Sequence, residues 1–239
     1  MLDMPAEHFE QMLVSQNDTS SSSYDFCHLV RDLPVRATPP SEAELKQIAE
    51  NYKKQLEQGF DWNCFANIIT DTYRYLSQWA TLSPEVRKAN TLLVLNHFID
   101  ITDTPFVPDE YTDPLLKSLM APLVDVLDMT LQPVLPVLPS QTQPAPTAER
   151  MKAFINEMKA TFADGVQVSD ISTCLKSTLT FVGSFPFLDK AGKKACVTKI
   201  VDALIKTANV PGPSFIVVPI IKQMVHPYID QIFEKLTFL

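Results

Sequence analysis

Glycine is scarce in this sequence, with five glycines among 239 residues against nineteen prolines. The five glycines stand singly along the chain. Phosphate-cradling loops and tight hairpin turns need several glycines close together, because glycine adopts their backbone angles without strain. A P-loop and a dinucleotide-binding fingerprint are therefore both absent, and no cofactor-binding residue is predicted.

Cysteine and histidine are also sparse, with four residues of each. Zinc sites need about four ligands at short spacings, and disulfide frameworks are typical of small secreted chains. The adjacent pair Cys27-His28 lacks two further ligands at such a spacing. The sequence therefore predicts no metal site, and buried free thiols in a reducing compartment. The four cysteines, all far apart, are Cys27, Cys64, Cys174 and Cys196.

Long apolar runs are missing as well, and a membrane-spanning helix needs about 18 or more apolar residues in succession. The segment 210–233 comes nearest, but Lys222, His226 and Asp230 interrupt it. The first residues carry carboxylates where a secretory leader has a basic end. We therefore expect an intracellular, cytoplasmic protein without a signal peptide or transmembrane segment.

The residues that are present predict an all-α fold. Apolar residues make up 46% of the chain and charged residues 20%, which is enough to bury one large core or two small ones. In residues 41–60 the apolar positions recur with the 3.6-residue period of one buried helix face. β-branched residues cluster only in "SFIVVP", so a strand has little support.

The chain resembles itself at an offset of 106 residues. This offset places "SEAELKQIAENYKKQLEQGF" (41–60) over "TAERMKAFINEMKATFADGV" (147–166), and "WATLSPEVRKA" (79–89) over "FPFLDKAGKKA" (185–195). After a deletion of one residue the offset becomes 105, and three prolines match. Low identity leaves chance similarity as the alternative, but the collinear order and the proline spacing favour a duplication. The matched prolines are Pro108 with Pro213, Pro114 with Pro219, and Pro122 with Pro227.

The comparison predicts four segments. A polar, Ser-rich tail covers residues 1–40, and a first helical repeat of about four helices covers 41–129. A Pro-rich linker covers 130–146, and a second, divergent repeat covers 147–239. The linker holds five prolines in 17 residues, so we expect an extended strap. In the tail, an apolar patch from Tyr24 to Val30 is typical of a short docking segment in a disordered arm.

Cap residues predict where the helices begin. Ser41 and Glu44 form a capping box before the first helix, and Thr147 takes the place of Ser41 in the second repeat. Ser83-Pro84 and Asp189 open the third helices, which run to about 101 and 207. The second helices are predicted at about 63–80 and 169–183.

The fourth helices carry internal prolines. We expect Pro219 in a first turn, where its missing N–H costs little. Pro122 and Pro227 lie deeper, so a bend or break is predicted within two residues of each.

Catalytic residues are hard to identify. His97 and Asp100 stand one helical turn apart, close to Asp103, but the second repeat has Ala203 and Lys206 where the pair would be. A surface His–Asp pair is therefore favoured over a catalytic site, and no catalytic residue is predicted. Four aromatic residues are expected in the core rather than around a ligand: Trp62, Tyr73, Tyr75 and Trp79.

Charge differs between the segments, and the net charge of the chain is −8. The tail carries −4, the first repeat −7, the linker 0 and the second repeat +3. Repeats of opposite sign attract each other, within or between chains, although drift of solvated faces explains the difference equally well. The basic cluster at 189–199 has neither arginine nor interleaved aromatics, so nucleic-acid binding is not expected.

These observations give three functional hypotheses. The first is a non-enzymatic structural or adaptor protein that binds protein partners, or itself, through helical repeats and extended straps, such as a minor component of a viral capsid. The second is a carrier of an apolar ligand or lipid in a helical cavity. The third is an enzyme that uses His97 and the neighbouring carboxylates.

Overall fold

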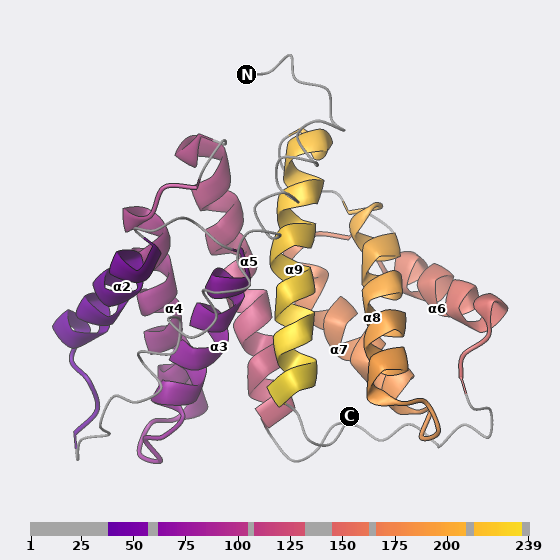
Figure 1. The fold of residues 1–239 in the computed structure, drawn as a ribbon, viewed down its shortest axis with the longest axis horizontal. Helices are drawn as coiled ribbons and strands as arrows, with labels where there is room; N and C mark the ends of the chain where they lie inside the picture. Colours follow the sequence, from indigo (N-terminus) through magenta and orange to yellow (C-terminus); the bar gives the residue numbers. More distant parts are fainter. Residues whose placement is uncertain are drawn as a thin grey trace. The chain divides into compact units, whose positions relative to one another are not determined.

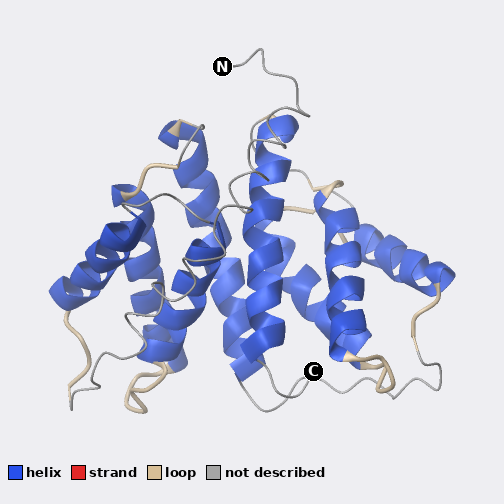
Figure 2. Ribbon diagram, in the orientation of Figure 1, coloured by secondary structure: helices blue, strands red, loops and turns tan. Residues whose placement is uncertain are grey.

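The computed structural model describes residues 38–56, 62–104, 108–131, 145–162, 166–208 and 213–235, with the side chains of 129–131 and 235 excepted. Within these ranges every regular element is a helix, apart from one isolated bridge between Val166 and Ala208 (Figure 2). The predicted all-α fold is confirmed. The elements are α2 (Glu42–Leu56), α3 (Trp62–Leu76), α4 (Pro84–Ile101), α5 (Asp109–Leu131), α6 (Ala148–Thr161), the 3₁₀ turn η2 (Val168–Asp170), α7 (Ile171–Gly183), α8 (Lys190–Ile205) and α9 (Ser214–Lys235) (Figure 1).

The chain divides into two compact units. Unit 1 ends at Val124 and unit 2 begins at Asp125, so the division falls inside α5. Residues 1–37 of the predicted tail and 132–144 of the predicted linker lie outside the described residues. Helix α5 continues to Leu131, just past the predicted start of the linker. The predicted segment boundaries remain predictions.

Equivalent helices of the two units begin at equivalent positions. Glu42 and Ala148, which begin α2 and α6, stand 106 residues apart, and so do Pro84 and Lys190, which begin α4 and α8. Trp62, the first residue of α3, corresponds at the same offset to the first residue of η2, which runs directly into α7. At the offset of 105, α5 and α9 also begin together. This agreement is compatible with the predicted duplication.

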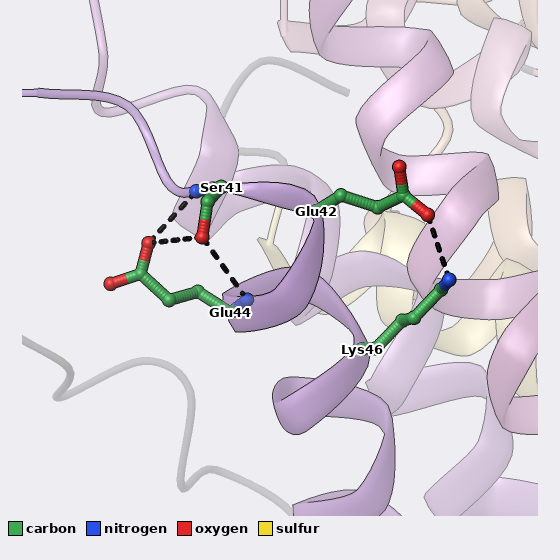
Figure 3. A network of polar contacts seen from close by, with 4 residues as sticks. All are labelled: Ser41, Glu42, Glu44 and Lys46. Atoms are coloured by element: carbon green, nitrogen blue, oxygen red, sulfur yellow. Dashed lines mark hydrogen bonds and ion pairs between the residues drawn. The ribbon is translucent and has the colours of Figure 1, made fainter.

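The capping box at the start of α2 is present as predicted. The Ser41 N–H and the Ser41 hydroxyl both donate to Glu44 Oε2, at 2.8 and 2.9 Å, while the Glu44 N–H donates to Ser41 Oγ (Figure 3). Beside it, Glu42 and Lys46 form an ion pair of 2.7 Å one turn apart. The reciprocal bonds satisfy donors that a helix N-terminus otherwise leaves without a partner.

Four helices in the two units are capped at the same position. In each case the side chain before the helix accepts a hydrogen bond from the N–H three residues later, which is the preferred N-cap geometry. Pro84 follows its cap directly, where its missing N–H has no cost. The four bonds are Glu44 N to Ser41 Oγ (3.4 Å), Arg150 N to Thr147 Oγ1 (3.2 Å), Val86 N to Ser83 Oγ (3.3 Å) and Gly192 N to Asp189 Oδ1 (2.8 Å).

The fourth helices place their prolines identically. Pro114 and Pro219 are the sixth residues of α5 and α9, and Pro122 and Pro227 are the fourteenth. The prediction that Pro219 occupies a first turn is wrong, because α9 already begins at Ser214. Earlier residues therefore provide the first turn, and the helix proceeds without a hydrogen bond at Pro219.

Neither helix is broken at its prolines, since α5 and α9 each run through both of them. The break that Pro122 and Pro227 were expected to allow is absent, and the bend remains a prediction. Both prolines are buried. Packing on both sides of these residues offsets the lost backbone bond.

Unit 1 has a core centred on α3. Every residue of α3 except Asn63 and Arg74 is buried. Helix α4 packs on both α2 and α3. Phe98 of α4 lies against the rings of Tyr52 and Phe65, with centroids 6.2 and 5.6 Å apart. Aromatic contacts therefore join three helices of this unit.

In unit 2 the helix contacts centre on α8. Helix α8 packs on α6, α7 and α9 (Figure 1). Phe154 of α6 stacks on Phe181 of α7 at 4.3 Å, and Phe185 lies against Phe181 at 5.5 Å. In the described part of the chain, no helix combines the length and the apolar character that a membrane span requires.

Candidate functional site

The predicted His97–Asp100 pair is not assembled in the structure. His97 lies partly exposed on α4 and makes no hydrogen bond with Asp100 or Asp103 among the described residues. Asp100 instead forms an ion pair with Lys117 of α5. In the described ranges, no group of three His, Cys, Asp or Glu side chains is placed to hold a metal ion. The geometry at His97 therefore gives no support to a catalytic pair.

The four aromatic residues of the first repeat belong to the core, as predicted. Trp62 and Tyr73 are essentially inaccessible to solvent, and Tyr75 and Trp79 are also buried. The rings of Tyr75 and Trp79 meet edge to face, with centroids 4.8 Å apart. Helix α3 ends at Leu76, four residues before the predicted end, so Trp79 reaches the core from the turn that follows.

The cysteines differ from the predicted set of free thiols. Cys64 is disulfide-bonded, so the prediction is wrong for this residue. Cys174 and Cys196 are free. Burial raises the pKa of Cys174 to about 12, and the charge of Asp170 adds to the effect. Cys174 is therefore a neutral, unreactive thiol at physiological pH.

A pocket in unit 2 is the candidate site for an apolar ligand. Its walls come from α7, α8 and α9 and from residues just before η2 and after α8, and they are almost entirely apolar. The cavity volume is about 20 Å³, which is room for roughly one water molecule. Sites for drug-sized ligands typically measure about 300–1,000 Å³. In this structure the pocket is too small for a lipid.

The end of unit 1 where α4 meets α5 gathers negative charge. We call this the acidic end, and it comprises Asp100, Asp103, Asp109, Glu110 and Asp113, with Lys117 among them. Asp113 Oδ1 is buried, and no hydrogen-bond partner is found for it within the described residues. Partial burial raises the pKa of Asp113, and Asp109 raises it further, while Lys117 opposes the shift and the other two aspartates add to it.

In unit 2, the positions that match those of the acidic end carry no carboxylate. We call this end of unit 2 the basic end, and it comprises Lys206 and Lys222 with Phe215. Lys206 takes the place of Asp100, and Lys222 takes the place of Lys117. No ion pair is found for either lysine among the described residues. The ion pair of unit 1 is thus replaced by two cations in unit 2.

Helices α8 and α9 are also joined by one ion pair and by one hydrogen bond between a histidine and an aspartate. Lys194 Nζ lies 2.7 Å from Asp230 Oδ1, and His226 Nε2 lies 2.8 Å from Asp202 Oδ1. Both pairs are partly exposed, so each contributes little to stability. They engage Asp202 and Asp230, and neither Lys206 nor Lys222 takes part in them.

Sequence reasoning predicted the opposite net charges of the repeats but missed these two ends. The available pattern was the spacing of Asp109, Asp113 and Lys117, which stand four residues apart on one helix face. The difference in charge between the two ends appears only where equivalent positions of α5 and α9 are aligned.

Comparisons with protein-family models, with curated proteins and with solved structures find no match for this chain.

Proposed function

We propose that this chain is a non-enzymatic structural or adaptor protein that binds protein partners through its helical units. One observation carries the proposal: two units with equivalent helix starts, caps and prolines differ in charge at the acidic and basic ends. A duplicated helix plan with one altered surface provides two different binding faces on one chain. Complementary charge at such faces selects partners and speeds their association.

The setting that fits such a protein is a larger assembly. A chain with two unlike faces connects two neighbours, and the predicted linker and tail add extended straps that lie along them. A minor component of a viral capsid or of a cytoskeletal complex has this character. A cytoplasmic location is part of the proposal.

Cross-linking in the native lysate tests this function. The tagged chain is cross-linked at low salt, purified under denaturing conditions, and its partners and cross-linked lysines are identified by mass spectrometry. We expect a partner at stoichiometric amounts, with cross-links at Lys206 or Lys222. The matched control is the exposed pair Lys53 and Lys54 of α2, which should cross-link less to partners. A chain that cross-links to no protein, itself included, contradicts the proposal.

The alternative function is a carrier of an apolar ligand, and the pocket in unit 2 is the feature that favours it. The cavity of about 20 Å³ would have to open considerably to admit a lipid. Native mass spectrometry of the purified chain distinguishes the two functions. A bound lipid at stoichiometric amounts would support the carrier, and a ligand-free mass would remove it.

A further inference from the structure

The two equivalent ends differ by more than net charge. In unit 1, Lys117 pairs with Asp100 and the acidic end still has four further carboxylates. In unit 2, the equivalent positions hold two lysines, Lys206 and Lys222. Each end therefore has unbalanced charge of the sign that the other end lacks.

The acidic end also contains a carboxylate oxygen that needs a donor. Asp113 Oδ1 is removed from solvent, and no hydrogen-bond partner is found for it among the described residues. A carboxylate without a hydrogen-bond partner favours a cation close to it. A lysine ammonium group, with three N–H donors, is a suitable partner.

An exposed aromatic side chain accompanies the charges at each end. Tyr111 in the first turn of α5 is 48% exposed, and Phe215 in the first turn of α9 is 37% exposed. Protein interfaces commonly place aromatic residues at the centre and polar residues around them. At the acidic end the ring shares its turn with Asp109 and Glu110, whereas the first turn of α9 carries no charged residue.

We propose that the acidic end of one copy of this chain binds the basic end of a second copy, so that copies associate head to tail. The proposal rests on the proposed function and identifies one partner as the chain itself. The two ends are built on equivalent helix pairs, α4–α5 and α8–α9, but they are different surfaces of the chain, so their contact is heterologous. Because each copy keeps one end of each kind, the contact continues from copy to copy.

Charge reversal with the full-length chain tests the proposal. Variant A carries Asp109→Lys and Glu110→Lys, and variant B carries Lys206→Glu and Lys222→Glu. The control variant carries Lys53→Glu and Lys54→Glu on α2, with the same charge change as variant B. All the changed residues are at least partly exposed, and circular dichroism checks that each variant folds.

Sedimentation velocity at about 20 mM and about 500 mM salt measures association, since charge interactions are strongly screened at the higher value. We expect the wild-type chain and the control to associate at low salt. Variants A and B should each associate at least about tenfold more weakly. An equimolar mixture of A and B should associate again, because the reversed acidic end of A complements the reversed basic end of B.

Three results would overturn the proposal: a wild-type chain that stays monomeric at low salt, variants that associate as well as the control, or a mixture that does not recover association. If the chain binds another protein in the lysate but not itself, the proposed function stands and the head-to-tail association is wrong. If it binds neither, both proposals are wrong.

Discussion

Helices α2 and α6 have the same sequence pattern but different degrees of burial. In α2, all five residues of the apolar face are buried, among them Ile48 and Tyr52. In α6, Met158 is the one buried residue, and Phe154, at the position equivalent to Ile48, is partly exposed. The period of apolar residues therefore determines which face of a helix turns inward, and the neighbouring elements determine how deeply it is buried.

The contacts of the two helices explain the difference. Tyr52 meets Phe98 edge to face, and the hydroxyl of Thr72 donates to the Tyr52 oxygen at 3.3 Å. Helix α6 instead makes a stacked contact between Phe154 and Phe181, with the guanidinium of Arg150 above the ring of Phe185. Phe181 and Phe185 are buried, whereas Phe154 remains partly exposed, because a stacked ring can keep its other face near water.

The largest predicted effect is that truncation of a smaller side chain in α2 lowers the free energy of unfolding more than truncation of a larger one in α6. Ile48→Ala should lower the free energy of unfolding by about 2–5 kcal/mol, because the site is fully packed. Phe154→Ala removes a larger side chain but should cost only about 1–2 kcal/mol, because that side chain is partly exposed. Urea unfolding measures both losses, and hydrogen exchange assigns each to its unit. A greater loss for Phe154→Ala would show that α6 is packed as firmly as α2.

The second prediction compares the caps of α4 and α8. Asp189→Ala should destabilise α8 by about 1–2 kcal/mol, and Ser83→Ala should destabilise α4 by about 0.5–1 kcal/mol. The aspartate bond is shorter, and its negative charge adds a favourable interaction with the helix dipole. Asp189→Asn is the matched control, since it keeps an acceptor without the charge. If thermal unfolding showed equal losses of stability for Asp189→Ala and Ser83→Ala, the charge of the aspartate would make no contribution.

The third prediction concerns pH and the acidic end. The pKa of Asp113 is raised in the folded chain, so the ionised carboxylate costs stability above that pKa. As pH falls through the raised value towards 3.8, this cost disappears. Asp113→Asn should therefore stabilise unit 1 at pH 7, by less than about 1 kcal/mol because solvent screens the group. Denaturation curves at several pH values should converge for the two chains at low pH, and a constant difference would contradict the assignment.

The smallest effect is one on reactivity rather than stability. Both free thiols have a raised pKa, but Cys174 is buried, whereas Cys196 is partly exposed. Iodoacetamide at pH 8 should modify Cys196 first, as peptide mass spectrometry will show, because the thiolate is the reacting form and needs access. Faster modification of Cys174 would mean that the pocket around it opens.

Local features of the fold were predictable because they depend on residues close together in the chain. The capping box of Ser41 and Glu44, the cap at Asp189 and the helical period all act over three or four residues. The two mistakes have different causes. The disulfide of Cys64 depends on a tertiary contact with another cysteine, whereas Pro219 was misplaced because α9 begins earlier, at Ser214.

At the acidic and basic ends, too, some features follow from the sequence and others depend on tertiary contacts. The charges of Asp109, Asp113 and Lys206 are evident in the sequence, and so are the net charges of the repeats. The pairing of Lys117 with Asp100 requires α5 to return alongside α4, and the exposure of Tyr111 requires that no other described helix cover the first turn of α5. Neither condition can be derived from residue spacing.

The sequence by itself determined the all-α class, the helix caps, the equivalent positions of the prolines and the charges available to each unit, because backbone hydrogen bonding and side-chain period are local. Only the tertiary structure decided that α5 and α9 continue through their prolines, that the apolar face of α2 is buried more deeply than that of α6, and that Asp100, Asp103 and Asp109 lie close enough to Asp113 to raise its pKa. Each of these depends on packing between segments far apart in the chain, where burial adds enough free energy to override a local preference.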